Sequence, residues 1–154
     1  GDLVRSLLIP SEHMQDVTWT DEGGDDYVEF LRDAMEHVRR IAPGTRIGVR
    51  TSLGDREGDI REINEDTDFF AFTFGSHGLD FAGAVGDLRA IFAEPKGRKK
   101  VAILDLSYPS WEKGGSTPQQ QAAFVKEVLR LAKENVGQLE WLSWWSLRDD
   151  DVEL

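Results

Sequence analysis

The sequence predicts an α/β fold with a parallel sheet, in the form of a partial (β/α) barrel of about five strands. Short apolar runs alternate with longer amphipathic segments, which is typical of parallel β/α units. The run Val101–Ser110 is an apolar strand that carries Asp105 near its end, where barrels present functional groups. The chain has 154 residues, whereas a closed barrel typically needs about 250. We therefore expect one domain over residues 1–154, with its strands side by side in chain order.

The first part of the chain is expected to form a strand and a long helix. The strand is expected at Leu3–Ile9, followed by a polar, exposed loop that includes Trp19–Gly24. Asp25 or Asp26 is expected to cap the helix, and Pro43-Gly44 ends it. The apolar residues of this helix recur at helical spacing and predict one buried stripe: Val28, Leu31, Met35 and Val38.

Two further strands are expected at Arg46–Ser52 and Asp68–Phe74. In the second of these, aromatic rings alternate with small side chains, so that the two kinds occupy opposite faces. The rings are Phe70, Phe72 and Phe74, and the small residues are Ala71 and Thr73. Rings toward the helices and small residues toward a barrel axis fit the fold, and the reverse arrangement is equally compatible with the sequence.

The second half of the chain predicts two helices and two strands. One helix has the stripe Phe81, Val85, Leu88 and Phe92 and ends at Pro95-Lys96-Gly97, before the Val101 strand. Thr117-Pro118, with Gln120 following, is a strong start for the next helix, because Thr caps and Pro suits the first helical position. The last strand is expected at Leu139–Leu147. The buried side of the last helix is expected to hold Phe124, Val128 and Leu131, with Val125, Leu129 and Ala132.

Charge and composition limit the partners that the chain is expected to have. With 40% apolar and 31% charged residues, the chain has enough material for one core and a solvated surface. The net charge of -11 argues against nucleic acid, because phosphate binding needs clustered Lys and Arg. The basic run Lys96–Lys100 is interpreted as a solvated turn. No segment approaches about 20 apolar residues, so we expect no membrane contact, and no charged-then-apolar leader follows Gly1.

No cofactor and no metal site are expected from the sequence. The chain has no cysteines, so it can form neither a disulfide nor a thiolate site. Phosphate-loop, dinucleotide-binding, zinc-protease and nucleophile-elbow patterns are not found in it. The run Asp149–Asp151 lacks the spacing of a calcium loop and is interpreted as a solvated tail.

Three segments carry a resemblance to a known family. They are Leu8–Met14, which contains Glu12, Leu104–Ser110, which contains Asp105, and Trp141–Asp149. They resemble the fourth, seventh and eighth strand motifs of clan A glycoside hydrolases, in particular endo-galactanase-like and endo-glucanase-like members. The resemblance implies a TIM-barrel-like fold, of which this chain would supply strands four to eight, and cleavage of β-linked sugars with retention.

The resemblance also implies roles for particular residues. Glu12 would be the acid/base and Asp105 the nucleophile, although the family has Glu at the second position. The remaining substrate-binding candidates are Ser11, His13, Arg50, His77, Tyr108, Trp144 and Trp145. Within this group, Ser11 stands where the family usually has Asn, and Trp144 or Trp145 would stack on the sugar. Alternation along the last strand places Trp141 and Trp145 on one side and Trp144 on the other.

Three hypotheses for the function follow. The first is a partial barrel related to retaining β-glycosidases. Its activity alone would be weak or absent, because the two departures from the family, Ser11 and Asp105, are at residues that take part in the reaction. The second is a non-catalytic carbohydrate-binding or assembly half-barrel. A five-stranded open sheet leaves two edges unpaired, so a second copy or a complementing chain would supply the missing strands. The third is a fragment or an engineered piece of a barrel.

Overall fold

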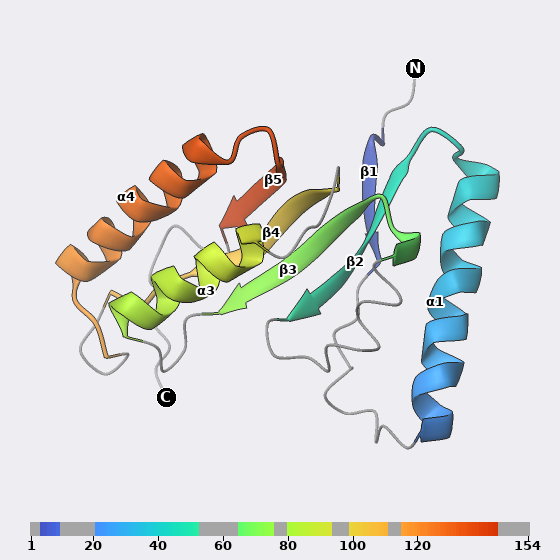
Figure 1. Ribbon diagram of the computed structural model, residues 1–154, viewed down its shortest axis with the longest axis horizontal. Helices are drawn as coiled ribbons and strands as arrows, with labels where there is room; N and C mark the ends of the chain where they lie inside the picture. Colours follow the sequence, from blue (N-terminus) through green and yellow to red (C-terminus); the bar gives the residue numbers. More distant parts are fainter. Residues whose placement is uncertain are drawn as a thin grey trace. The chain divides into compact units, whose positions relative to one another are not determined.

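The computed structural model describes residues 4–9, 21–52, 65–75, 80–93, 99–110 and 115–144 (Figure 1). The elements, in chain order, are β1 (Ser6–Ile9), α1 (Asp21–Ile41), β2 (Arg46–Ser52), β3 (Phe69–Gly75), α3 (Phe81–Ala93), β4 (Lys100–Ser107), α4 (Pro118–Glu134) and β5 (Leu139–Trp144). The five strands form one sheet in the order β1-β2-β3-β4-β5, and both β1–β2 and β4–β5 pair in parallel. The predicted α/β fold, with strands in chain order as in part of a parallel barrel, is confirmed.

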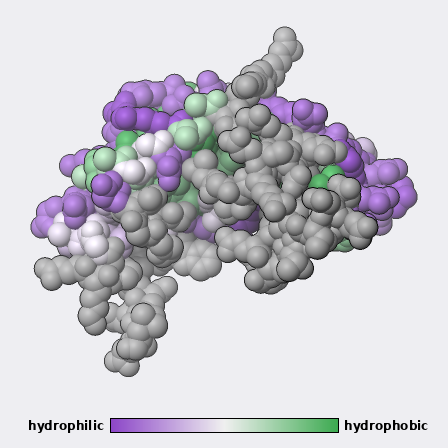
Figure 2. Space-filling model, turned by 60° about the horizontal axis from the view of Figure 1, so that its bottom comes forward, coloured by the Kyte–Doolittle hydropathy of each residue, from purple (hydrophilic) through white to green (hydrophobic). Residues whose placement is uncertain are grey.

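The chain divides into two compact units, Gly1–Ala71 and Phe72–Leu154, with the boundary inside β3. The first contains β1, α1, β2 and the start of β3. The second contains the rest of β3, α3, β4, α4 and β5. On the face shown in Figure 2, hydrophilic residues predominate among the described part of the chain, as expected for a chain with 31% charged residues.

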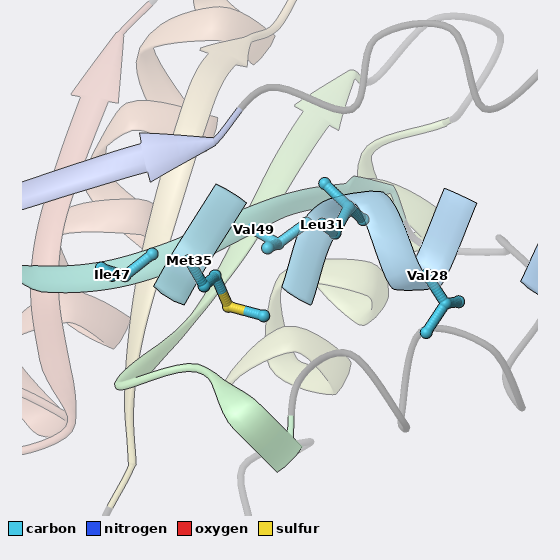
Figure 3. Packing of buried hydrophobic residues seen from close by; sticks show 5 residues of the cluster. All are labelled: Val28, Leu31, Met35, Ile47 and Val49. Atoms are coloured by element: carbon cyan, nitrogen blue, oxygen red, sulfur yellow. The ribbon is translucent and has the colours of Figure 1, made fainter. Parts of the chain in front are cut away.

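The core of the first unit lies between α1 and β2 (Figure 3). Val28, Leu31 and Met35 follow helical spacing on α1, and Ile47 and Val49 alternate on β2. All five are buried, and the predicted stripe on α1 is confirmed. Since burying one such side chain contributes roughly 1.5–3 kcal/mol, this cluster is what holds the helix on the strand.

The helix α1 begins earlier than expected. Asp25 and Asp26 lie inside it, because the backbone is already helical at Asp21, and the expected loop Trp19–Gly24 is helical from that residue onward. Acidic residues are favourable at the N-terminus of a helix, where the helix dipole is positive. Packing of the buried stripe stabilises the helix by more than the two glycines in its first turns destabilise it. The helix ends at Ile41, before Pro43, as predicted.

Arginines of α1 tie the segment before β3 to the helix. Arg32 Nε lies 2.9 Å from Asp66 Oδ2, and Arg39 donates to the Asp66 carbonyl oxygen at 2.6 Å. The carboxylate of Asp68 accepts a hydrogen bond of 2.8 Å from the backbone N–H of Ile47 in β2. These contacts fix where β3 enters the sheet.

The sheet face opposite α1 is filled by an aromatic ring. Because Ile47 and Val49 face α1, the residue between them, Gly48, faces the other way. There the fully buried ring of Phe69 lies so close that a Cβ built on Gly48 would be 2.2 Å from its Cε2 atom. The guanidinium of Arg46 lies 5.7 Å from the centre of the same ring, in a cation–π contact. Gly48 is therefore required for this packing.

The core of the second unit is an aromatic cluster centred on Phe124 of α4. Its ring stacks on Tyr108, with centroids 4.6 Å apart, and on Phe74 of β3 at 5.8 Å. Trp144 of β5 lies at 6.3 Å, and Phe81 of α3 packs edge-on against Tyr108. Phe74 thus points toward a helix, which agrees with the arrangement of rings that fits a barrel.

The start of α4 is as predicted from the sequence. Thr117 Oγ1 accepts a 3.2 Å hydrogen bond from the backbone N–H of Gln120, and Pro118 occupies the first turn. The buried side contains Phe124, Val128 and Leu131. Leu129, which was also expected there, is 62% exposed, because it lies one residue beyond Val128 and points to solvent.

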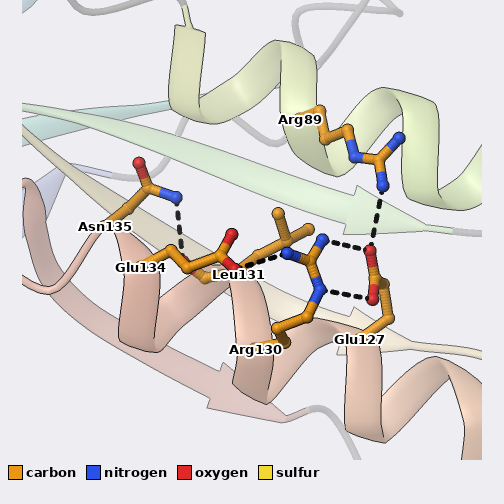
Figure 4. Close-up of polar contacts among 6 residues, drawn as sticks. All are labelled: Arg89, Glu127, Arg130, Leu131, Glu134 and Asn135. Atoms are coloured by element: carbon orange, nitrogen blue, oxygen red, sulfur yellow. Dashed lines mark hydrogen bonds and ion pairs between the residues drawn. The ribbon is translucent and has the colours of Figure 1, made fainter.

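A charged network joins α3 to α4 (Figure 4). Arg130 makes two hydrogen bonds to the carboxylate of Glu127, at 2.6 and 2.8 Å, and a third to Glu134. Arg89 of α3 donates to Glu127 at 3.0 Å. Hydrogen bonds from Arg130, assisted by its charge and by Arg89, lower the pKa of Glu127 from 4.5 to about 2. Glu127 therefore stays ionised in mild acid.

This lowered pKa predicts a pH-dependent contribution to stability. The folded state prefers the ionised form, so the stabilisation is full above about pH 4.5 and is lost as the pH falls toward 2. We expect Glu127→Gln to lower the Tm by about 1–3 °C at neutral pH, with the difference from the native chain vanishing near pH 2. Thermal unfolding by circular dichroism across this range measures it. Glu36→Gln, at an exposed position of α1, is the control. A difference in Tm between Glu127→Gln and the native chain that does not change with pH would contradict the lowered pKa of Glu127.

Candidate functional site

Asp105 lies near the end of β4, as the sequence suggested, and within an irregularity of the strand. The strand continues for two residues beyond it, to Ser107. The pairing with β5 shifts at this point, since Ile103 pairs with Leu142 while Leu106 pairs with Trp144. From one pair to the next, β4 advances by three residues while β5 advances by two. This is the pattern of a β-bulge, whose extra residue on β4 is Leu104 or Asp105.

The backbone of Asp105 is in the left-handed region, with φ of 52°. Among the described residues it is the one non-glycine position with positive φ. Such conformations cost of order 1–3 kcal/mol, although Asp tolerates them better than most residues. Strained residues and bulges are both enriched beside functional sites, where they re-aim a side chain. Asp105 is thus the described residue that the backbone marks most clearly.

The strain predicts an unusual order of stability among substitutions at this position. In a regular strand, Gly is less stable than Ala by roughly 0.5–1 kcal/mol. With φ of 52° at Asp105, the order is expected to invert, with Asp105→Gly more stable than Asp105→Ala by about 1 kcal/mol. Urea unfolding of the two variants measures the difference. Ala102→Gly, in the regular part of β4, is the control and is expected to destabilise. A Gly variant weaker than the Ala variant at position 105 would show that the bulge is absent.

Trp144 and Tyr108 both lie on the side of the sheet that faces α4. Tyr108 is only 3% exposed, with its ring between Phe124 and Phe81, and its carbonyl oxygen accepts a 2.8 Å hydrogen bond from Gln121 Nε2. Trp144 is partly buried and contacts the same Phe124. Tyr108 and Trp144, two of the substrate-binding candidates from the sequence, therefore contribute to the core of the second unit.

Trp141 lies on the other side of the β4–β5 pair. It pairs with Ala102. Because successive side chains of a strand point to opposite faces, Leu142 and Trp144 lie on one face of β5 and Trp141 lies on the other. Trp141 is partly exposed. The sequence suggested that the tryptophans divide between the two faces, and that is confirmed for Trp141 and Trp144. Which face each one takes was not predictable, because β4 is apolar on both faces and its pattern does not reveal the bulge.

The remaining site residues are divided between the units and the undescribed segments. Arg50 belongs to the first unit, where it is partly buried and, by alternation from Gly48, faces away from α1. Asp105, Tyr108 and Trp144 belong to the second unit. Outside the described residues lie Ser11, Glu12, His13, His77 and Trp145. The pairing of Glu12 with Asp105 thus stays a prediction.

Comparisons with protein-family models, with curated proteins and with solved structures gave no match to this chain. Within the described ranges, no three or more His, Asp or Glu side chains gather in a way that could hold a metal ion. None of the helices described is both long and apolar enough to cross a membrane.

Proposed function

We propose that the chain is a carbohydrate-binding α/β domain of glycoside hydrolase type, in which Asp105 is the carboxylate that meets the sugar. The observation that carries the proposal is the left-handed backbone of Asp105 within a bulge of β4. A strained acidic residue near the carboxyl end of a parallel strand has the position and the chemistry of a catalytic group in such folds. The resemblance of three segments to clan A glycoside hydrolases adds the substrate class.

The chemistry of retention sets what this chain would have to provide. Two carboxyl groups must stand about 5–5.5 Å apart, one to attack the anomeric carbon and one to protonate the leaving oxygen. Glu12 is the proposed acid/base and Asp105 the proposed nucleophile. Asp is one methylene shorter than Glu, which withdraws the attacking oxygen by about 1 Å, and such a displacement can cost on the order of 100-fold in rate. We therefore expect binding of β-linked oligosaccharides with weak turnover.

An assay on aryl β-glycosides, together with calorimetric titration of β-linked oligosaccharides, tests the proposal. Asp105→Glu is expected to raise turnover, and Asp105→Asn to abolish it while leaving binding within about threefold. Asp87→Asn on α3 is a matched control in the same unit and is expected to change neither. If the native chain and Asp105→Glu neither bind nor hydrolyse any of these sugars, the proposal fails.

A second candidate function, that of an assembly unit, is favoured by the edges of the sheet. In the described sheet β1 and β5 each have one neighbour, and apolar residues beside the β1 edge are exposed, with Val4 at 53% and Leu7 at 37%. Open strand edges template pairing with another chain. Light scattering after size exclusion tests this function. A dimer that Leu7→Lys converts to monomer would support it, and a monomer at all concentrations would exclude self-assembly.

A further inference from the structure

We infer that a second copy of this chain docks head to tail, with α1 of one copy packed along α4 of the next. This inference rests on the second proposed function, self-assembly, and specifies the surfaces that would form the contact. It is independent of sugar binding. Its basis is an exposed apolar stripe on each of the two helices, with charges of opposite sign beside the two stripes.

The helix α4 has a second apolar stripe besides its buried one. This α4 side stripe recurs at alternating steps of three and four residues and lies about a third of a turn around the helix from the buried stripe. Two of its members are largely exposed, Leu129 at 62% and Val136 at 70%. Its residues are Ala122, Val125, Leu129, Ala132 and, just after the helix end, Val136.

A stripe of the same spacing lies on α1. Two members of this α1 side stripe are largely exposed, Phe30 at 59% and Ile41 at 67%, and the ring of Phe30 stacks on that of Tyr27 with centroids 6.2 Å apart. Alternating steps of three and four residues let two parallel helices pack along their length. The stripe is apolar except for one histidine, and its residues are Tyr27, Phe30, Ala34, His37 and Ile41.

Contacts of the two helices show that the stripes lie on their outer flanks. On α4, Glu127 faces Arg89 of α3 at 3.0 Å (Figure 4), and the α4 side stripe lies on the flank opposite Glu127. On α1, Arg32 and Arg39 reach Asp66, just before β3, and the α1 side stripe lies on the flank opposite these arginines. The α4 side stripe is therefore on the side of the β5 edge, and the α1 side stripe is on the side of the β1 edge.

A second copy that continues the sheet would bring these two flanks together. With β1 of one copy beside β5 of the next, right-handed connections place the two helices parallel and on the same face of the sheet. Aligned from their first residues, the side stripes put Phe30 opposite Val125. The next layer puts Ala34 opposite Leu129, so that a larger side chain meets a smaller one in each layer.

The charges beside the stripes have opposite signs. Exposed Lys126 and Lys133 border the α4 side stripe, and exposed Asp26 and Asp33 border the α1 side stripe. The same alignment places Asp26 opposite Lys126, and Asp33 opposite Lys133. Arg40, the next residue on the acidic side of α1, lies past the end of α4 in this alignment and faces neither lysine. Two α4 helices packed antiparallel would instead bring lysines together, and two α1 helices would bring aspartates together, so charge favours the α1–α4 pair.

Charge reversal tests the inference, with light scattering after size exclusion over a range of protein concentrations as the measurement. The α1 variant carries Asp26→Lys and Asp33→Lys, and the α4 variant carries Lys126→Asp and Lys133→Asp. The native chain is expected to associate. Each variant alone is expected to associate at least about tenfold more weakly, because like charges then face each other between copies.

An equimolar mixture of the two variants is the decisive sample. Its association is expected to return to within about threefold of the native chain. The lysines now on α1 of one variant meet the aspartates now on α4 of the other, and the unchanged charges of the two variants also pair. A variant that had failed to fold could not restore association in this way, and circular dichroism verifies the fold of each one separately.

The matched control carries Glu29→Lys and Glu36→Lys. These exposed residues of α1 lie away from its side stripe, and the two changes alter the net charge as much as those of the α1 variant. Association within about twofold of the native chain is expected. An effect as large as that of the α1 variant would point to overall charge and would contradict the α1–α4 contact.

The outcomes separate this inference from self-assembly itself. If the native chain associates but the charge reversals leave association unchanged, or the mixed variants stay apart, the copies meet at another surface. Self-assembly then stands without the α1–α4 contact. A native chain that is monomeric at all concentrations overturns both, and the sugar-binding proposal is unaffected by either result.

Discussion

Replacing Phe124 by alanine is expected to destabilise the protein by about 3–5 kcal/mol. The Phe124 ring is fully buried, and it contacts rings from β3, β5 and the segment after β4. Each aromatic pair adds about 0.5–1.5 kcal/mol beyond area burial, and no neighbouring side chain can fill the resulting cavity without breaking another pair. Since single domains are stable by only about 5–15 kcal/mol, this variant approaches the limit of folding.

Urea unfolding followed by near-ultraviolet circular dichroism measures the effect on the aromatic cluster. Phe124→Leu keeps most of the apolar volume and is expected to lose less than half as much stability as Phe124→Ala. Leu129→Ala on the same helix is the matched control, because that side chain is 62% exposed, and a change within about 0.5 kcal/mol is expected there. Equal losses for Phe124→Ala and Leu129→Ala would mean that α4 does not pack as described.

Gly48→Ala is expected to destabilise the first unit by at least 1–3 kcal/mol, an effect out of proportion to one added methyl group. The new Cβ would lie 2.2 Å from Cε2 of Phe69, well inside van der Waals contact. The ring of Phe69 is fully buried and also makes a cation–π contact with Arg46, so it has no open space to enter. Either β2 or the ring must shift.

A double-mutant cycle separates this clash from a loss of backbone freedom. Phe69→Leu removes ring atoms that meet the new Cβ, so Gly48→Ala is expected to cost markedly less in the Phe69→Leu background, with a coupling of about 1 kcal/mol or more. Gly86→Ala in α3 is the control, because a Cβ there meets nothing within 4 Å and a helical Gly→Ala change stabilises by roughly 0.5–1 kcal/mol. Additive effects in the cycle would contradict the described packing.

The elements of this fold were predictable because local signals and hydrophobic period agree along most of the chain. The helix start at Thr117-Pro118 and the strand Arg46–Ser52 are confirmed at their expected residues. The predicted start of α1 was wrong, because Gly23-Gly24 suggested a loop. The buried stripe that begins at Val28 packs against β2, and this packing stabilises the whole helix, including the turns that precede Val28. Local glycine signals lost there to tertiary packing.

The candidate site was predictable only in part. The sequence indicated Asp105 as a site residue, because burying a carboxylate among apolar strand residues costs free energy unless the charge is paired or lies at a cleft. It could not show which face of the sheet Trp141 and Trp144 each take, because that depends on how β5 pairs with β4, and the two register shifts in this pair leave no signature in the sequence. It also could not show that Tyr108 is covered by Phe124 and Phe81, since these residues come from different elements.

By itself, the sequence determined the α/β class, the chain order of the strands and the buried stripes, because periodicity and caps act over a few neighbouring residues. The tertiary structure alone decided the left-handed backbone at Asp105, the fit of Phe69 over Gly48 and the face taken by each tryptophan. These features arise where residues distant in the chain meet, and only the pairing of two strands fixes which residue of each one lies opposite the other.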